Sequence, residues 1–295
     1  MTRSRTALCA LFVTLLCIAW PARAADAADP VLVRVREAVL DPSGSARVVV
    51  GISGADRSLS AGDFSVREGG RPIAAVSATP LAEAGADAVS VVLAIDVSGS
   101  TAGEPLADAK AAAKAFLAGL HPRVRVALVA FGADATLKSP FTQDRARLGR
   151  LIDALQAKGD TTLYDAVVLA SQQFGRTEAA SSIIVFSDGK DTGSAASLGR
   201  ALDLAKRAGA PVTSIALQTR DVDLDALRAL AQATGGRLLR VNQSGDLQSA
   251  FTSAARDIAS QYVLSYSVQG RREGDVEIAV TARIAGRSAE DSIVA

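Results

Sequence analysis

The stretch Val89-Ser-Val-Val-Leu-Ala-Ile-Asp-Val-Ser-Gly-Ser100 decides the fold of this 295-residue chain. Residues 89–95 form a near-continuous apolar run, which is typical of a parallel strand buried on both faces. Asp96, Ser98 and Ser100 follow at every second position, so in an extended loop their side chains point the same way. One carboxylate and two hydroxyls therefore converge at the carboxyl end of a strand, where open α/β sheets bind ligands.

Two further segments carry side chains of the same kind. Gly159-Asp-Thr-Thr-Leu-Tyr-Asp-Ala166 opens a predicted helix, and Phe186-Ser-Asp-Gly-Lys-Asp191 follows an apolar strand. Asp188 stands at the carboxyl end of that strand, where it can join Asp96. Hydroxyl and carboxylate oxygens suit Mg²⁺, Mn²⁺ or Ca²⁺ and are poor ligands for zinc or copper. Each segment alone is typical of an ordinary turn or helix cap, but the three together predict a divalent-metal site.

The region around these segments alternates between strands and helices. Strands are predicted over 89–95, 124–131, 182–186, 212–217 and 237–241, and helices over 106–120, 148–155, 163–174, 198–208, 224–233 and 247–260. This alternation predicts an α/β fold with a doubly wound, Rossmann-like, largely parallel sheet and right-handed crossovers.

Blocks of short strands flank the α/β region. About four antiparallel strands are expected over 31–79, including a hairpin at Gly69-Gly70, and three more over 262–294. The predicted boundaries are a signal segment over 1–24, N-terminal sandwich strands over 25–80, the α/β domain over 88–260 and C-terminal strands over 261–295. A three-stranded piece buries little core, which favours one small sandwich made by both blocks; two separate β extensions are the alternative.

The first 24 residues have the features of a signal peptide. Arg3 and Arg5 precede an apolar run over 7–20, Pro21 ends it, and Ala22-Arg-Ala24 fits a small-x-small cleavage site. We therefore expect an exported protein in the periplasm, in the cell envelope or outside the cell, with an uncleaved N-terminal anchor as the alternative. No second long apolar run follows, so no stable membrane insertion is expected after cleavage.

The composition argues against several classes of function. The 32 Lys and Arg residues balance 31 Asp and Glu residues, and aromatic residues make up 4% of the chain, so we expect no nucleic-acid partner. Both cysteines lie in the predicted signal segment, and His121 is the single histidine. Because mechanisms of the Ser/His/Asp, Cys/His and zinc-hydrolase types need these residues, the chain is expected to bind a partner and not to be an enzyme.

The three polar segments, in this order, resemble the metal-ion-dependent adhesion site of von Willebrand factor A domains. The resemblance implies that Ser98 and Ser100 ligate the metal directly and that Thr161 does so when an outside ligand is engaged. It also implies that Asp96 and Asp188 lie near the metal, largely through water. Family members leave one coordination position open for a Glu or Asp of a protein partner.

The resemblance has one departure and one ambiguity. Asp160 stands where the family often has Gly, and Thr162 competes with Thr161 as the third hydroxyl ligand. Asp160, Tyr164 and Lys190 are expected to form the rim that meets the partner. Hydroxyl ligands neutralise little of a dication's charge, so the metal, expected to be Mg²⁺ with Mn²⁺ or Ca²⁺ as alternatives, would attract an outside carboxylate.

The flanks at 59–72 and 261–266 also resemble the β regions beside this domain in a group of exported bacterial proteins. The expected function is therefore an exported, metal-dependent module for protein binding or adhesion. Two alternatives stay open. One is a structural scaffold in an envelope, secretion or pilus assembly, in which the metal only stabilises loops. The other is a metal-assisted phosphohydrolase, with Asp96 as the nucleophile or general base and Lys190 as the nearest candidate to bind phosphate.

Overall fold

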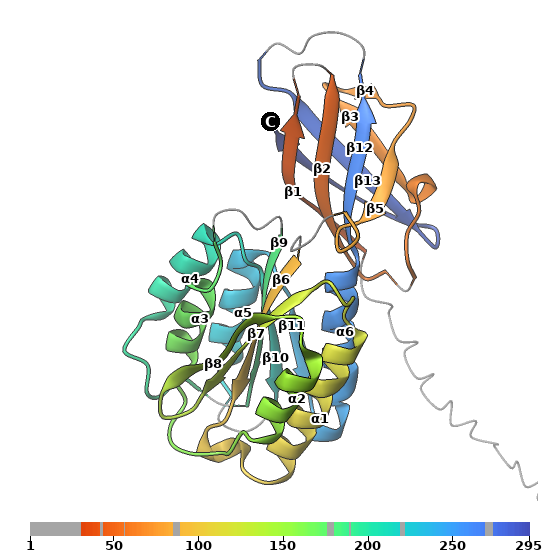
Figure 1. Cartoon of the computed structure of the whole chain (residues 1–295). Helices are drawn as coiled ribbons and strands as arrows, with labels where there is room; N and C mark the ends of the chain where they lie inside the picture. The colour runs from red at the N-terminus through yellow and green to blue at the C-terminus, as the bar shows by residue number, and fades with distance from the viewer. Residues whose placement is uncertain are drawn as a thin grey trace, which may run out of the picture.

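Figure 1 shows the computed structural model, which describes residues 31–41, 44–55, 57–84, 89–175, 180–188, 190–218, 222–268 and 274–295. The predicted signal segment and both cysteines lie outside these residues. One six-stranded sheet and two four-stranded sheets make up the fold of the described part. The predicted class, an α/β domain with a flanking β-sandwich, is confirmed.

The six-stranded sheet has the strand order β11-β10-β9-β6-β7-β8. Its strands are β6 (Val89–Asp96), β7 (Arg125–Phe131), β8 (Ala135–Thr142), β9 (Ala180–Ser187), β10 (Val212–Leu217) and β11 (Leu238–Val241). Every side chain of the central strand β6 is buried, as its apolar run predicts. The strands pair in parallel except for β8, which runs antiparallel to β7 at the edge.

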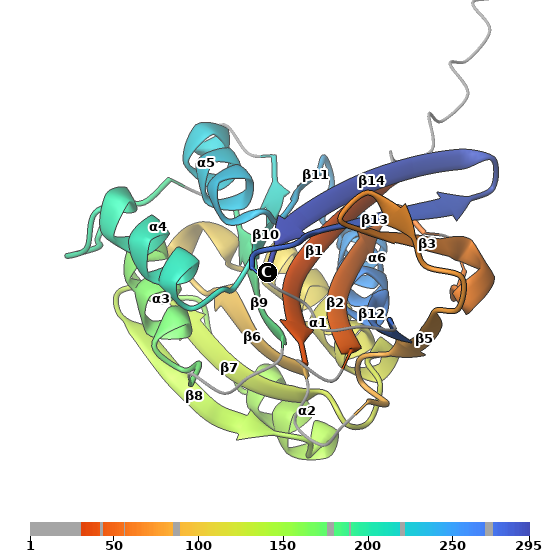
Figure 2. The same cartoon turned by 90° about the horizontal axis from the view of Figure 1, so that it is seen from above.

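Helices cover both faces of this sheet, as Figure 2 shows from above. One face is covered by α1 (Glu104–Gly119), α2 (Arg145–Asp153) and α6 (Leu247–Ala259), and the other by α3 (Leu163–Ser171), α4 (Leu198–Arg207) and α5 (Leu224–Thr234). The ring of Phe251 lies 6.1 Å from that of Phe116 and 6.3 Å from that of Phe186, which joins α6 to α1 and to the sheet. Helices α2, α4 and α5 begin at side-chain caps supplied by Asp144, Ser197 and Asp223.

The sandwich combines strands from both ends of the described chain. One sheet has the order β1-β2-β12-β5, and the other has the order β14-β13-β3-β4. Their bounds are β1 (Leu32–Leu40), β2 (Ser45–Ser53), β3 (Phe64–Glu68), β4 (Arg71–Pro72), β5 (Ser77–Pro80), β12 (Gln261–Ser267), β13 (Glu277–Ile284) and β14 (Arg287–Val294). The sandwich has its own core, in which the rings of Phe64 and Tyr262 lie 5.4 Å apart. The prediction of one sandwich is therefore correct, with five N-terminal strands in place of about four.

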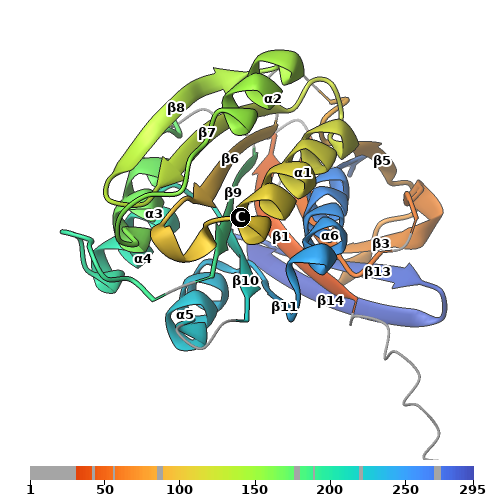
Figure 3. The same cartoon turned by 90° about the horizontal axis from the view of Figure 1, so that it is seen from below.

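The sandwich covers the amino ends of the parallel strands. Side chains at the starts of β9 and β10 share a cavity with residues of β1 and β2. Leu81 donates its backbone N–H to the Gln261 carbonyl at 2.7 Å, and Ile52 donates to the Ser260 carbonyl at 2.9 Å. The carboxyl ends of the parallel strands consequently lie on the side away from the sandwich, as the view from below shows (Figure 3). No helix in the described part of the chain is long and apolar enough to cross a membrane.

Candidate metal centre

The Asp96 carboxylate lies at the carboxyl end of β6 and is fully buried. Its Oδ1 accepts a hydrogen bond from the Ser98 backbone N–H at 2.8 Å, which closes a tight turn after the strand. Its Oδ2 accepts from the Ser187 hydroxyl at 2.6 Å. Because β9 pairs with β6, Ser187 reaches Asp96 from the neighbouring strand, so both strands hold this carboxylate in place.

The two predicted serine ligands connect this turn to Asp188. The hydroxyl oxygens of Ser98 and Ser100 lie 2.9 Å apart. Ser100 donates its hydroxyl proton to Asp188 Oδ1 at 2.9 Å, so the bond between the two serines uses the proton of Ser98. Asp188 is 1% exposed, whereas Ser100 is exposed. Four of the five predicted ligands therefore gather in one place, and Ser100 marks its open side.

The Thr161 segment packs against the same turn through its backbone. Lys158 donates its N–H to the Val97 carbonyl at 2.7 Å, and Gly99 donates to the Gly159 carbonyl at 2.8 Å. Gly159 has a positive φ of 80°, and a Cβ there would lie 2.5 Å from the Ala133 Cβ, so the close approach requires glycine. The third predicted segment is thus held directly beside the first.

The Thr161 hydroxyl itself stays outside the hydrogen-bonded cluster. Thr161 is 5% exposed, its carbonyl accepts from the N–H groups of Thr192 and Gly193, and no described residue joins its hydroxyl to the serines or aspartates. The Thr162 hydroxyl is enclosed and has no partner among the described residues. Thr161 therefore lies beside the cluster, and its hydroxyl has no hydrogen bond to the cluster among the described residues.

The three predicted rim residues differ in their surroundings. Asp160 and Lys190 are exposed, and Tyr164 is half-buried in the first turn of α3. The Tyr164 backbone N–H donates to Asp191 Oδ1 at 3.1 Å. Burial raises the pKa of the Tyr164 phenol, and the negative charges of Asp191 and Asp223 raise it further. Tyr164 therefore remains a neutral hydroxyl at physiological pH.

Sequence reasoning missed the residues that support the cluster. Ser187 lies inside the quoted segment around Asp188, but a local pattern did not show that its hydroxyl reaches Asp96. Asp165 accepts from the N–H groups of Ala195 and Ala196, both at 2.9 Å, and so attaches the segment after Asp188 to α3. These roles depend on which loops meet in space, and the residue spacing along the chain does not contain that information.

The electrostatics of the cluster fit a hard divalent cation. Burial raises the pKa of the Asp96 carboxyl to about 6, the nearby Asp188 charge adds to this, and hydrogen bonds from Ser187 and Ser98 oppose it. No group of three or more His, Cys, Asp or Glu side chains suited to a metal occurs among the described residues, so the donors here are two carboxylates with hydroxyls. A cation would offset the two buried negative charges, and oxygen-only donors favour magnesium-like ions.

The fold and the ordered segments are similar to those of von Willebrand factor A-type domains. The family model for the von Willebrand factor type A domain matches residues 91–190, which contain all the predicted metal-site residues. A UPF0353 protein of Mycobacterium tuberculosis strain H37Rv is 27% identical over 225 residues, which cover 65% of this chain and 67% of that protein. The sequence comparisons therefore support a domain of this type in the α/β part of the chain.

Solved structures show the same fold. A von Willebrand factor type A protein from Catenulispora acidiphila has a TM-score of 0.56 at 16% identity, and the match covers 90% of this chain and 72% of that one. Proximal thread matrix protein 1 from the mussel byssus, solved with a zinc-occupied MIDAS motif, has a TM-score of 0.53 at 18% identity over 65% of this chain and 50% of that one. At such identities the likeness establishes the fold alone.

Proposed function

We propose that this protein is an exported, metal-dependent binding module that takes the carboxylate of a protein partner through a divalent cation. The observation that carries the proposal is the hydrogen-bonded chain from Ser98 through Ser100 to Asp188, beside buried Asp96, at the open carboxyl edge of the sheet. Serine hydroxyls would hold the cation directly, with Thr161 joining when the partner engages. The two aspartates would supply the negative charge around it.

The cation supplies an electrophilic centre for an outside carboxylate. The chain's own residues orient the site: Ser187 and the Ser98 N–H fix Asp96, and the Lys158 and Gly99 backbone bonds keep the Thr161 segment in reach. We propose Mg²⁺ as the natural ion, with Mn²⁺ and Ca²⁺ as alternatives. Because the mussel protein holds zinc in its MIDAS motif, Zn²⁺ belongs in the same titrations.

Asp160, Tyr164 and Lys190 form the proposed rim around the cation. Lys190 is exposed and positively charged, so it would attract an acidic partner, while Asp160 is exposed and would discriminate against a second acidic group nearby. The neutral Tyr164 hydroxyl can donate a hydrogen bond to a carboxylate. The partner's contact segment is therefore proposed to carry one Glu or Asp with few flanking acids.

The proposal assigns no catalytic residue. His121 lies in the turn between α1 and β7, and β7 runs parallel to β6, so the histidine belongs to the opposite edge of the sheet from Asp96. The proposed export rests on the basic start, apolar run and Ala22-Arg-Ala24 site of the first 24 residues. Mass spectrometry of the protein from the cell envelope tests cleavage after Ala24 against a retained anchor.

Metal binding by the full mature chain is the first test. After bound metal has been removed with chelator, we expect one Mn²⁺ per chain by electron paramagnetic resonance. Calorimetry should likewise give one Mg²⁺ per chain. The double variant Ser98→Ala, Ser100→Ala should lower the affinity at least 100-fold, whereas Ser288→Ala, an exposed serine of β14, should not change it. Equal affinity in the double variant and the control would refute the metal site.

A second step separates partner binding from a purely structural metal. A short peptide with a single glutamate is added to the Mn²⁺-loaded protein, and the same peptide with glutamine serves as the control. If the glutamate peptide changes the Mn²⁺ spectrum and the glutamine peptide does not, the result supports an open coordination position. A large rise in the melting temperature with metal and no response to either peptide would favour the scaffold interpretation.

A further inference from the structure

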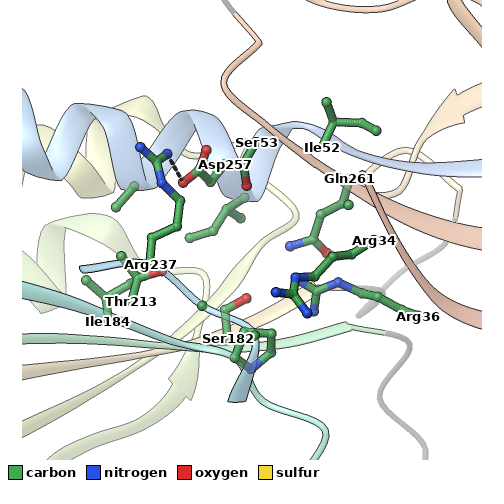
Figure 4. Close-up of a pocket in the computed structure, with 16 residues that line it drawn as sticks. Arg34, Arg36, Ile52, Ser53, Ser182, Ile184, Thr213, Arg237, Asp257 and Gln261 are labelled. Atoms are coloured by element: carbon green, nitrogen blue, oxygen red, sulfur yellow. Dashed lines mark hydrogen bonds and ion pairs between the residues drawn. The ribbon is translucent and has the colours of Figure 1, made fainter. Parts of the chain in front are cut away.

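A second polar cavity lies at the seam between the sandwich and the α/β domain, on the opposite edge of the sheet from Asp96. Its volume is about 40 Å³, and its walls come from β1 and β2, from the starts of β9 and β10, and from α6. Figure 4 shows Arg34 and Arg36 entering from the sandwich side and facing the Arg237–Asp257 ion pair of the α/β domain. That ion pair has an N–O distance of 2.7 Å.

The strand register explains how the sandwich side of this cavity is built. Arg34 of β1 and Gln261 of β12 both stand opposite Gly51 of β2, so all three positions share one face of the sheet. Gly51 leaves space between them: a Cβ there would lie 3.2 Å from Arg36 Nε. Arg36 lies two residues after Arg34 in β1, so strand alternation places its side chain on this same face, and it is the extra residue of a β-bulge between Val35 and Glu37.

The cavity concentrates positive charge that the described residues do not neutralise. Three arginines line it against one carboxylate, Asp257, which Arg237 already uses. Neither Arg34 nor Arg36 forms an ion pair with a carboxylate in the described part of the chain. Arg36 donates a hydrogen bond to the Ser181 carbonyl at 3.4 Å. Arg34 packs closely against Gly235 at the C-terminal end of α5, where a Cβ would lie 2.7 Å from Arg34 Nη1. The single long bond to a backbone carbonyl offsets only part of the charge.

Two buried polar atoms aimed at this cavity have no partner among the described residues. They are Arg36 Nε, a donor, and Gln261 Oε1, an acceptor. Gln261 is 2% exposed, so its amide oxygen cannot turn to bulk water. An enclosed polar group without a hydrogen bond destabilises the folded chain, which indicates that something polar occupies the space between them. Burial lowers the pKa of Arg36 to about 10, and the neighbouring Arg34 charge adds to this shift.

We propose that this cavity binds one small protonated oxyanion of the hydrogen-phosphate class, held by Arg34 and Arg36, with Gln261 Oε1 accepting a hydrogen bond from the O–H group of the anion. A water molecule needs roughly 10–15 Å³ by this measure, so about 40 Å³ holds a single small oxyanion and excludes a nucleotide. Planar guanidinium groups match oxyanions with paired N–H donors. The free acceptor of Gln261 favours an anion that carries an O–H group, which hydrogen phosphate has at neutral pH and sulfate lacks.

The bound anion would join the two parts of the molecule. Arg34 and Arg36 belong to the sandwich, while Arg237 and Asp257 belong to the α/β domain. Without an anion, the adjacent positive charges of Arg34 and Arg36 on the sandwich side repel each other. A bound anion would offset this repulsion and attract the arginines of both sides, which would fix the sandwich on the amino edge of the sheet.

Calorimetric titration of the full mature chain with sodium phosphate at pH 7 tests the proposal. Chelator is present throughout, so that the metal site stays empty, and sodium gluconate keeps the ionic strength constant. We expect one phosphate per chain, binding at least tenfold weaker in Arg34→Gln and in Arg36→Gln, and unchanged in Arg71→Gln, an exposed arginine of β4. Since Arg34 is exposed, Arg34→Gln is expected to fold even if Arg36→Gln does not.

The outcomes separate the parts of the proposal. No phosphate binding, or equal binding in Arg34→Gln and the unchanged chain, would overturn the site. Sulfate should bind at least tenfold weaker than phosphate, and Gln261→Leu should reduce this preference. Equal affinity for both anions would overturn the role of Gln261. Each variant is compared with the unchanged chain in the same anion, so that the general effect of sulfate and phosphate on protein stability is the same on both sides of the comparison.

Discussion

The carboxyl ends of the parallel strands (the carboxyl edge of the sheet) and their amino ends (the amino edge) carry opposite charge and opposite exposure. At the carboxyl edge, two buried aspartates and two serines face an open side at Ser100. At the amino edge, three arginines with one aspartate line a cavity covered by the sandwich. Loops that follow parallel strands present short sequence segments to solvent, whereas the amino edge is completed only by strands from elsewhere in the chain. The first edge is therefore suited to an outside partner, and the second to a small ion that joins domains.

The largest expected difference between the edges is in pH dependence. Because burial raises the pKa of Asp96 from its ordinary 3.8 to about 6, folding favours the protonated acid, and the metal-free protein loses stability as the pH rises from about 4 to about 6. The loss is on the order of 3 kcal/mol, is complete above pH 6 and is absent in Asp96→Asn. Urea unfolding of both proteins in chelator, between pH 4 and 8, measures it. Parallel curves for the two proteins would contradict this prediction.

The second prediction is that Asp96→Asn loses metal while Asp257→Asn does not. Asparagine keeps one oxygen for the Ser98 N–H and an N–H₂ group for Ser187, so the turn should survive. The charge is lost, and we expect the Mn²⁺ affinity to fall at least 100-fold, which is about 2.7 kcal/mol. Calorimetry checks both variants. An equal loss in Asp257→Asn would show that the edges are coupled and not separate sites.

The third prediction concerns stability gained from the metal. At a free Mg²⁺ concentration ten times the Kd, the free energy of unfolding should rise by about 1.4 kcal/mol, because only the folded chain assembles the site. The gain should vanish in Ser98→Ala, Ser100→Ala and persist in Arg34→Gln. Denaturant unfolding at fixed ionic strength measures it. If Arg34→Gln loses the gain instead, the assignment of the cation to the carboxyl edge is wrong.

The sequence predicted the carboxyl edge much better than the amino edge. The apolar run before Asp96 predicts a buried strand, and the polar positions after it belong to one continuous segment, so local spacing is sufficient. Arg34 and Gln261 are more than 200 residues apart and meet only because β1 and β12 both pair with β2. Strand alternation places Arg36 on the face of Arg34, but the sequence alone does not show which elements pack against that face.

Edge strands and side-chain supports were also missed, for physical reasons. Strand β8 has mostly exposed side chains and contains Pro140, so it shows neither the buried run nor the alternation of a strand. Ser187 belongs to the fully buried strand β9, and its hydroxyl has a role only because Asp96 ends the adjacent strand. Sequence reasoning thus predicted the side chains that gather at the candidate site and overlooked Ser187, which positions one of them.

The fourth prediction tests the covered edge. Asp257→Ala removes one ion-pair partner of Arg237, whose side chain is 18% exposed, and takes a negative charge from a cavity that is already positive. We expect a loss of about 1 kcal/mol in the free energy of unfolding, and a larger loss at low ionic strength because the repulsion is then less screened. Phosphate should restore part of it. A loss that phosphate leaves unchanged would mean that the aspartate acts by packing alone.

The smallest change in the free energy of unfolding is expected for another aspartate–arginine ion pair, one that lies on an exposed helix. Asp203 and Arg207 form an ion pair along α4 with an N–O distance of 3.3 Å, but their side chains are 68% and 76% exposed. Water already solvates both groups there, so Asp203→Ala should change the free energy of unfolding by less than about 0.5 kcal/mol and respond to neither phosphate nor metal. Denaturant curves beside those of Asp257→Ala provide the measurement. If Asp203→Ala and Asp257→Ala lose equal free energy of unfolding, enclosure does not strengthen the Arg237–Asp257 pair. The charge at the covered edge then affects stability no more than the charge on an exposed helix.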